Sequence, residues 1–199
     1  MAFSDYKTIS QVQKEFGVKY QEENFIQSQP FEPHESFLID LQFNLENMDV
    51  YTSEASRTEI VISPILREVY KKYYEKYSFW IQKTITYSDK LSGTPDYLIA
   101  TKSSLGKTVL ETPLIVIVEA KKNDFEQGWG QCLAELVAAQ KINGNNLLPV
   151  YGVVTDGELW KFGKLIDTTF IKNIKGYTVT ALSELFGAID FILQAAIPK

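Results

Sequence analysis

The chain has 199 residues, of which 45% are hydrophobic and 23% charged, and its formal net charge is −5. This composition is typical of a globular chain that buries its own core, and it excludes a collagen-like or fully disordered protein. The longest apolar run, PLIVIV at residues 113–118, is far too short to cross a bilayer, so we expect no membrane partner.

The first fifty residues predict a helix followed by two strands. Residues 6–16 suit a short helix because Ile9, Val12 and Phe16 recur at helical spacing. Residues 19–27 and 36–47 are predicted as strands, the second because apolar residues occupy alternate positions along it. We expect these elements to form an added N-terminal helix and β-strand layer in front of the main core.

A helix is predicted to begin at Ser53, a favourable N-cap, with Glu54 at the positive end of the helix dipole. The helical pattern runs on through residues 58–77. Pro64 must interrupt or kink it, or restart a helix that Ser63 caps.

The middle of the chain predicts strands, then a long helix, then a hairpin. The strand candidates are residues 78–88, 94–102 and 112–122. A helix over 124–142 ends at the sequence NGNN, and two strands then flank the turn dipeptide Asp156-Gly157. A last helix covers about 180–196. This order predicts an α/β (α+β) fold, in which a central mixed sheet is flanked by helices.

Asp96, Glu119 and Lys121 are the residues that point to chemistry. Side chains alternate along a strand, so Glu119 and Lys121 point the same way, at the end of a run that is apolar on both faces. If the strand of Asp96 lies beside this run, its carboxylate meets Glu119 across the ladder. Two close carboxylates repel each other unless a cation or a lysine stands between them.

This arrangement suits a divalent cation. Oxygen ligands favour Mg²⁺ or Mn²⁺, and a lysine beside the metal helps to activate water and to stabilise charge on a phosphate. The alternative is a structural ion pair of Glu119 with Lys121 or Lys122, because the pattern E-x-K is common in proteins.

Pro95-Asp96 followed by Glu119-Ala120-Lys121 resembles the signature of the PD-(D/E)xK nuclease superfamily. More narrowly, residues 53–163 resemble the N-terminal nuclease domain of type I restriction enzyme R subunits and its stand-alone relatives. The matching pieces are SEASRTEIVISPIL, GTPDYLIA, VIVEAKK, a helix beginning near GWGQCLAEL, and the hairpin YGVVTDGELWKF. The resemblance covers a little over half of the chain. It implies a restriction-endonuclease-like core of order αβββαβ and Mg²⁺-dependent (or Mn²⁺-dependent) hydrolysis of a DNA phosphodiester.

The resemblance also implies roles for single residues. Asp96 and Glu119 would be metal ligands, with the carbonyl of Ala120 as a third, and Lys121 would be the catalytic lysine. The family places a further acid on the first core helix, where Glu54 is preferred over Glu59. These two lie about 140° apart on an α-helix, so only one of them is expected to reach the metal.

The helix after the E-x-K strand offers a further candidate, because related nucleases often carry a glutamine there. Gln131 fits, with Gln127 one turn before it and Glu135 one turn after it. Gly128 and Gly130 weaken the start of this helix, so that either the backbone approaches the site closely or the helix begins only at Gln131. Trp129 either stacks on a base or packs against the sheet.

Several lysines are candidates for contact with DNA phosphates or are simply solvated: Lys71, Lys72, Lys76, Lys83, Lys90, Lys102, Lys107 and Lys122. Residues 1–54 carry three lysines and ten acidic residues, which is unusual for a free DNA-cutting enzyme. A protein partner or a homodimer formed through this segment would explain the acidity, and so would simple solvation.

Two readings of the function therefore remain open. The first is a metal-dependent DNA endonuclease that works without ATP, because no GxxxxGK[ST] phosphate loop is present. The second is a non-catalytic module that keeps the nuclease fold and binds DNA or a protein. In both cases residues 1–199 form a single domain, with an extension at 1–52, a nuclease-like core at 53–165 and a C-terminal helix extension at 166–199.

The expected compartment is the cytoplasm. A single cysteine, Cys132, cannot form an internal disulfide, and the first residues lack the pattern of a signal peptide. Cys132 is read as an inert core thiol, and His34, the single histidine, cannot build a zinc cluster.

Overall fold

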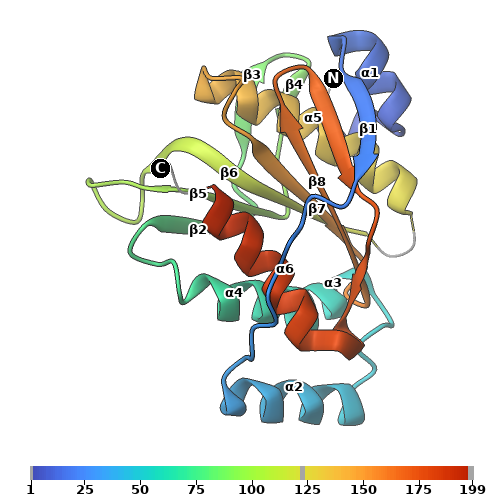
Figure 1. Cartoon of the computed structure of the whole chain (residues 1–199), viewed down its shortest axis with the longest axis vertical. Helices are drawn as coiled ribbons and strands as arrows, with labels where there is room; N and C mark the ends of the chain where they lie inside the picture. Colours follow the sequence, from blue (N-terminus) through green and yellow to red (C-terminus); the bar gives the residue numbers. More distant parts are fainter. Residues whose placement is uncertain (1, 122–123, 197–199) are drawn as a thin grey trace.

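The computed structural model describes residues 2–121 and 124–196. Its centre is a mixed sheet with the strand order β1-β9-β8-β7-β6-β5-β2, and β10 pairs with β8 (Figure 1). The bounds of these strands are β1 (Lys19–Glu23), β2 (Tyr77–Ile81), β5 (Tyr97–Lys102), β6 (Leu110–Ala120), β7 (Val150–Thr155), β8 (Leu159–Ile166), β9 (Thr169–Asn173) and β10 (Tyr177–Thr178). A separate hairpin pairs β3 (Ile85–Ser88) with β4 (Leu91–Gly93).

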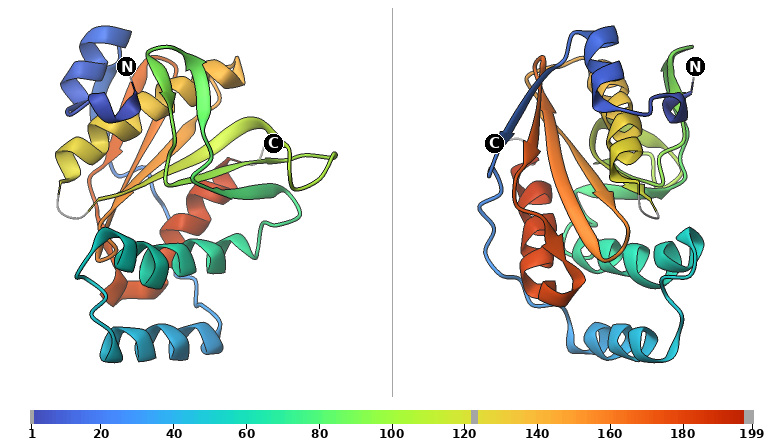
Figure 2. Two further views of the ribbon diagram at one scale, coloured as in Figure 1. Left: turned by 180° about the vertical axis from the view of Figure 1, so that it is seen from behind. Right: turned by 90° about the vertical axis from the view of Figure 1, so that its right-hand side faces the viewer.

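Helices cover both faces of the sheet (Figure 2). Their bounds are α1 (Ile9–Phe16), α2 (Glu35–Asn47), α3 (Glu54–Arg57), α4 (Ser63–Tyr70), α5 (Phe125–Asn143) and α6 (Leu182–Ala195), with a π-helical turn at Thr58–Ile62 and 3₁₀ turns at Phe3–Asp5 and Val179–Ala181. One core lies beneath α5 and α1, and the other lies beneath α4 and α6. Within β6, Ile117 packs into the first core and Val118 into the second, which makes β6 a central strand.

The predicted fold class is confirmed. A helical segment over 54–70 is followed by β2, β5, β6, α5 and β7, which is the αβββαβ order expected from the sequence. β5 pairs antiparallel with β6, and β6 pairs parallel with β7. The predicted hairpin is also present, because β7 and β8 pair antiparallel around Asp156-Gly157, where Gly157 has φ +89°.

Residues 36–47 form helix α2, so the prediction of a strand was wrong. The side chains that pack inward are Phe37 and Leu41, which are four residues apart and lie on one face of a helix. Ile39 and Phe43, which a strand would have placed on the same face as these two, are each 62% exposed. The alternation of apolar residues along 36–47 therefore did not indicate which side chains are buried.

The two terminal segments extend the main sheet, whereas the N-terminal one was expected to form a layer of its own. β1 pairs parallel with β9, and β9 pairs antiparallel with β8. Neither β9 nor β10 was predicted. The first strand candidate, residues 78–88, also differs, because it divides into β2 and β3.

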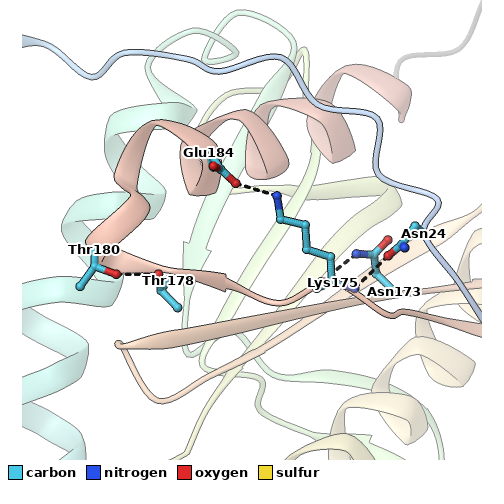
Figure 3. Close-up of polar contacts among 6 residues, drawn as sticks. All are labelled: Asn24, Asn173, Lys175, Thr178, Thr180 and Glu184. Carbon is cyan, nitrogen blue, oxygen red and sulfur yellow. Dashed lines mark hydrogen bonds and ion pairs between the residues drawn. The ribbon is translucent and has the colours of Figure 1, made fainter.

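Polar contacts fasten the N-terminal segment to the end of the chain (Figure 3). Asn24 Oδ1 accepts from the backbone N–H of Lys175 at 2.9 Å, and Lys175 Nζ pairs with Glu184 on α6 at 2.6 Å. Asn173, which is 3% exposed, accepts from the backbone N–H of Ile26 at 3.2 Å. These contacts fix how residues 24–26 pass along the sheet edge.

The helical turn before Pro64 departs from α-helical geometry. The helix does not break there; it widens into the π turn at Thr58–Ile62, in which the N–H of Ser63 bonds to the carbonyl of Thr58. Proline has no N–H to offer to the carbonyl four residues earlier, and its ring crowds that carbonyl. A π turn takes in an extra residue and is found frequently at functional sites.

Across the ranges that the structure describes, no helix is both long enough and apolar enough to cross a membrane.

Candidate active site

Asp96 lies directly before β5, beside the end of β6. Tyr97 pairs with Val118 in the antiparallel ladder. Asp96, one residue before Tyr97, therefore lies opposite Glu119, one residue after Val118. Asp96 Oδ2 accepts a hydrogen bond of 2.8 Å from the backbone N–H of Ala120. This bond holds the half-buried carboxylate at the edge of the sheet where β6 ends.

Glu119 and Lys121 form an ion pair in which Lys121 Nζ lies 3.3 Å from Glu119 Oε2. Glu119 is 1% exposed, whereas the side chain of Lys121 is 18% exposed. The backbone N–H of Lys121 donates to the carbonyl of Thr155 on β7 at 2.8 Å, which extends the sheet pairing past the end of β6. Ala120, between the two charged residues, is 1% exposed.

The carboxyl groups of this cluster are hard to ionise. Burial, and then the charge of Asp96, raise the pKa of Glu119 to about 7. Burial raises the pKa of Asp96, against the opposing effects of the Ala120 hydrogen bond and of Lys121. Burial alone would lower the pKa of Lys121, but the carboxylates of Glu119 and Asp96 outweigh it and raise the pKa. Lys121 therefore carries its positive charge at neutral pH.

Helix α5 adds a second buried acid to the cluster. Glu135 is 0% exposed, and its Oε1 accepts from Gln131 Nε2 at 3.1 Å. Burial, and then Glu119, raise the pKa of Glu135 well above its usual range, so that the two carboxyl groups hydrogen-bond when one is protonated. Gln131 was expected at this site. The sequence placed Glu135 one helical turn after Gln131 and gave no other sign that it belongs to the site.

Glu54 and Glu59, both in the helical segment over 54–70, line the same cavity as Asp96. This cavity measures about 920 Å³, and its wall includes Glu54, Glu59, Arg67 and Tyr97. The charge of Glu54 acts on both Asp96 and Lys121, whereas the charge of Glu59 acts on Tyr97. The segment that separates them is α-helical over Glu54–Arg57, and the π turn begins only at Thr58.

The donor set is compatible with a hard divalent cation. Among residues 2–121 and 124–196, no three His, Cys, Asp or Glu side chains gather into a preformed metal cage. Buried Glu119 Oε1, however, accepts no hydrogen bond from an N–H or hydroxyl group, and the carboxylate of Asp96 stands nearby. Two carboxylates and a backbone carbonyl leave several positions for water, which is the ligand set that Mg²⁺ and Mn²⁺ accept.

The two glycines of α5 permit close packing. The helix begins at Phe125, close to the predicted start at 124, so the alternative that it begins only at Gln131 is wrong. A Cβ atom at Gly128 would lie 2.7 Å from Val154 Cγ1 and 3.0 Å from Lys121 Cγ. A Cβ atom at Gly130 would lie 2.5 Å from the backbone nitrogen of Thr8. Gly128 thus lets the helix lie directly against the catalytic-lysine candidate.

Trp129 packs against the sheet instead of being available for a base. It is 2% exposed, and its ring lies 5.4 Å from that of Phe170. Cys132 is 0% exposed, and burial raises the pKa of its thiol well above the usual range, so it stays protonated. Neither side chain reaches solvent at this site.

Most of the lysines proposed to contact phosphate have other partners. Lys71 pairs with Glu68, Lys72 with Asp190 and Lys90 with Glu15. Lys102 Nζ donates to the carbonyl of Tyr74, and Lys83 lies over the ring of Trp80. Lys122 lies outside the described residues.

The comparisons with known proteins give a distant likeness in structure. No protein-family model matches the sequence, and no curated protein matches it. Among solved structures, part of the type IIG restriction endonuclease BpuSI aligns with 67% of this chain at a TM-score of 0.42 and 15% sequence identity. This chain covers 16% of that enzyme, so the activity of the enzyme belongs to a much longer protein.

Proposed function

We propose that this chain is a metal-dependent deoxyribonuclease that hydrolyses DNA phosphodiester bonds, with Mg²⁺ or Mn²⁺ as its cofactor. One observation carries the proposal: Asp96, Glu119 and Lys121 meet at the adjoining ends of β5 and β6, and no N–H or hydroxyl group donates to buried Glu119 Oε1. A structural ion pair at a strand end needs no third acid. This site has Asp96 and Glu135 as well: the charge of Asp96 raises the pKa of Glu119, and Glu119 in turn raises the pKa of Glu135.

Each residue has a proposed role. Asp96, Glu119 and the carbonyl of Ala120 would hold the metal, and Glu54 would reach it from the helical side, through water. A bound Mg²⁺ would supply Lewis-acid polarisation of the phosphate and a more acidic water. Lys121, positively charged and partly exposed, would stabilise the charge that develops on the phosphate oxygens and orient the attacking water. Gln131 and Glu135 would keep Glu119 in place from behind.

Cleavage assays with matched variants test the proposal. Supercoiled, linear and single-stranded DNA are incubated with Mg²⁺ or Mn²⁺ and with wild type, Lys121→Ala, Asp96→Asn, or the control Lys141→Ala. Lys141 is exposed and lies in the last turn of α5, whereas Lys121 lies against Gly128 near the start of that helix. We expect cleavage by wild type and by the control, and a loss of about 10²–10⁴ in rate for the two site variants.

Two outcomes would contradict the proposal. If wild type and every variant are inactive on all substrates, the chain is a non-catalytic module that binds DNA or a protein partner. If all of them cut equally, the activity belongs to a contaminant, and Asp96 and Lys121 have no part in it.

A further inference from the structure

Two lysines beyond the candidate active site form no ion pair with any carboxylate in the described part of the chain. Lys161 on β8 and Lys172 on β9 are half-buried, and Glu22 on β1 is the cross-strand neighbour of Lys172. Each lies over an aromatic ring of α5: Lys161 Nζ is 5.2 Å from the ring centre of Phe125, and Lys172 Nζ is 5.8 Å from that of Trp129. Neither of these lysines was among those singled out from the sequence.

The strand register sets both lysines on the same face of the sheet as Glu119. Glu119 pairs with Val154, and Val154 pairs with Lys161, so these three side chains share the α5 face. Lys172 pairs with Gly163, two residues beyond Lys161 on β8. Lys161 is two strands away from Glu119, which is about 10 Å. Along a DNA axis, this corresponds to about three base-pair steps.

The surroundings of the two lysines favour an anion. Burial, and then the charge of Lys161, lower the pKa of Lys172, whereas Glu22 opposes this shift. Two like charges held near each other are costly unless a negative group lies between or above them. Their arrangement over the first turns of α5 also sets them near the positive end of a helix of 19 residues.

A cavity is present at the same place. It measures about 420 Å³, and Lys172, Phe125 and Trp129 form part of its wall together with the polar side chains of Thr8, Ser10, Gln13 and Glu126. Trp129, 2% exposed, has an indole N–H without a hydrogen-bond partner. The cavity thus combines a cation and one indole N–H without a partner, with one carboxylate, Glu126, at its wall.

We propose that Lys161 and Lys172 bind backbone phosphates of the DNA strand whose scissile bond lies at Asp96, Glu119 and Lys121. This inference rests on the proposed function and adds a direction to it: the bound DNA crosses the sheet edge from β6 toward β9, over the N-terminal end of α5. Lys121, Lys161 and Lys172 then form one basic track on an otherwise acidic protein. The phosphate contacts made there position the duplex and carry no sequence preference.

The test is DNA binding measured without cleavage. A fluorescein-labelled duplex of 20 base pairs is titrated in Ca²⁺ at several salt concentrations, and a gel of each sample checks that the DNA stays intact. The proteins are wild type, Lys161→Gln/Lys172→Gln, the charge-retaining pair Lys161→Arg/Lys172→Arg, and the control pair Lys14→Gln/Lys141→Gln. The control removes the same charge from exposed lysines in the last turns of α1 and α5, and Lys141 lies about 24 Å along α5 from Phe125.

We expect the Gln pair to bind about tenfold more weakly at low salt and to lose about 1.8 from the slope of log K against log salt, because two phosphate contacts are removed. The Arg pair and the control pair should bind like wild type. Thermal unfolding checks that each variant is folded, and the single variant Lys172→Gln, with half of the slope change, replaces the Gln pair if that pair does not fold.

Several outcomes would overturn the inference. Unchanged binding by the Gln pair would overturn it and leave the proposed nuclease function standing, whereas no DNA binding by wild type would overturn both. An equal loss in the control pair would show an effect of net charge alone. A labelled mononucleotide is titrated in parallel: if only its binding falls in the Gln pair, the lysines take a free phosphate ester and not DNA.

Discussion

The substitution Glu119→Gln should remove a penalty that the wild-type protein carries at neutral pH. The pKa of Glu119 is raised from 4.5 to about 7, chiefly by burial. Between these values the native state keeps the proton while the unfolded chain has lost it. The native state therefore binds more protons, and the free energy of unfolding falls as the pH rises.

The size of this effect follows from the shift. One pKa unit corresponds to about 1.4 kcal/mol, so the full contribution is about 3 kcal/mol, of which about 2.5 kcal/mol is lost between pH 5 and pH 8. Glutamine keeps the shape of the side chain and cannot ionise, so the variant should not lose this amount. Between pH 5 and pH 8 in the absence of metal, Glu119→Gln is thus expected to gain about 2.5 kcal/mol in stability relative to wild type.

Urea unfolding at pH 5 and pH 8, in the presence of a chelator, measures this directly. Wild type, Glu119→Gln and Glu32→Gln are compared; Glu32 is an exposed glutamate that serves as the control. The difference between wild type and Glu119→Gln should change by about 2–3 kcal/mol across this range, and the control should follow wild type. Parallel pH dependence in all three proteins would refute the reasoning, because Glu119 would then ionise as freely in the native state as in the unfolded chain.

Two further substitutions test the packing that holds the site. Gly130→Ala should destabilise the protein by about 1–3 kcal/mol in urea unfolding, because its Cβ would lie 2.5 Å from the backbone nitrogen of Thr8. This loss is expected although alanine is a better helix former than glycine. A gain in stability would contradict this packing. Arg57→Ala should cost about 2–3 kcal/mol, because the buried guanidinium donates to the carbonyls of Asp156 at 3.0 Å and Tyr51 at 2.9 Å. An unchanged midpoint of urea unfolding would mean that these hydrogen bonds do not hold the β7–β8 turn against α3.

The elements that the sequence predicts correctly are those with a strong local signal. The apolar run before Glu119 is buried on both faces, as an uninterrupted run of branched residues indicates, and Asp156-Gly157 forms the turn that this dipeptide favours. The pairing of β5 with β6 follows because the two strands are consecutive candidates. This pairing is what brings Asp96 beside Glu119.

The parts that were missed depend on contacts distant in sequence. The alternation in residues 36–47 fits a strand and a helix equally well until Phe37 and Leu41 are seen to pack inward. The π turn at Thr58–Ile62 and the cavity that both Glu54 and Glu59 line follow from no simple period of the sequence. Lys161 and Lys172 lie on different strands, and only the register of β8 with β9 shows that they share a face with Glu119.

Binding of Mn²⁺ tests the central claim most directly. Titration of wild type, Asp96→Asn and Glu32→Gln at pH 8, followed by electron paramagnetic resonance of free Mn²⁺, counts the bound ions without any need for DNA or cleavage. The proposed site predicts one saturable ion in wild type and in Glu32→Gln, and an affinity lower by roughly tenfold or more in Asp96→Asn. Equal binding by all three proteins, or no saturable binding by wild type, would contradict the claim that Asp96 and Glu119 form a metal site.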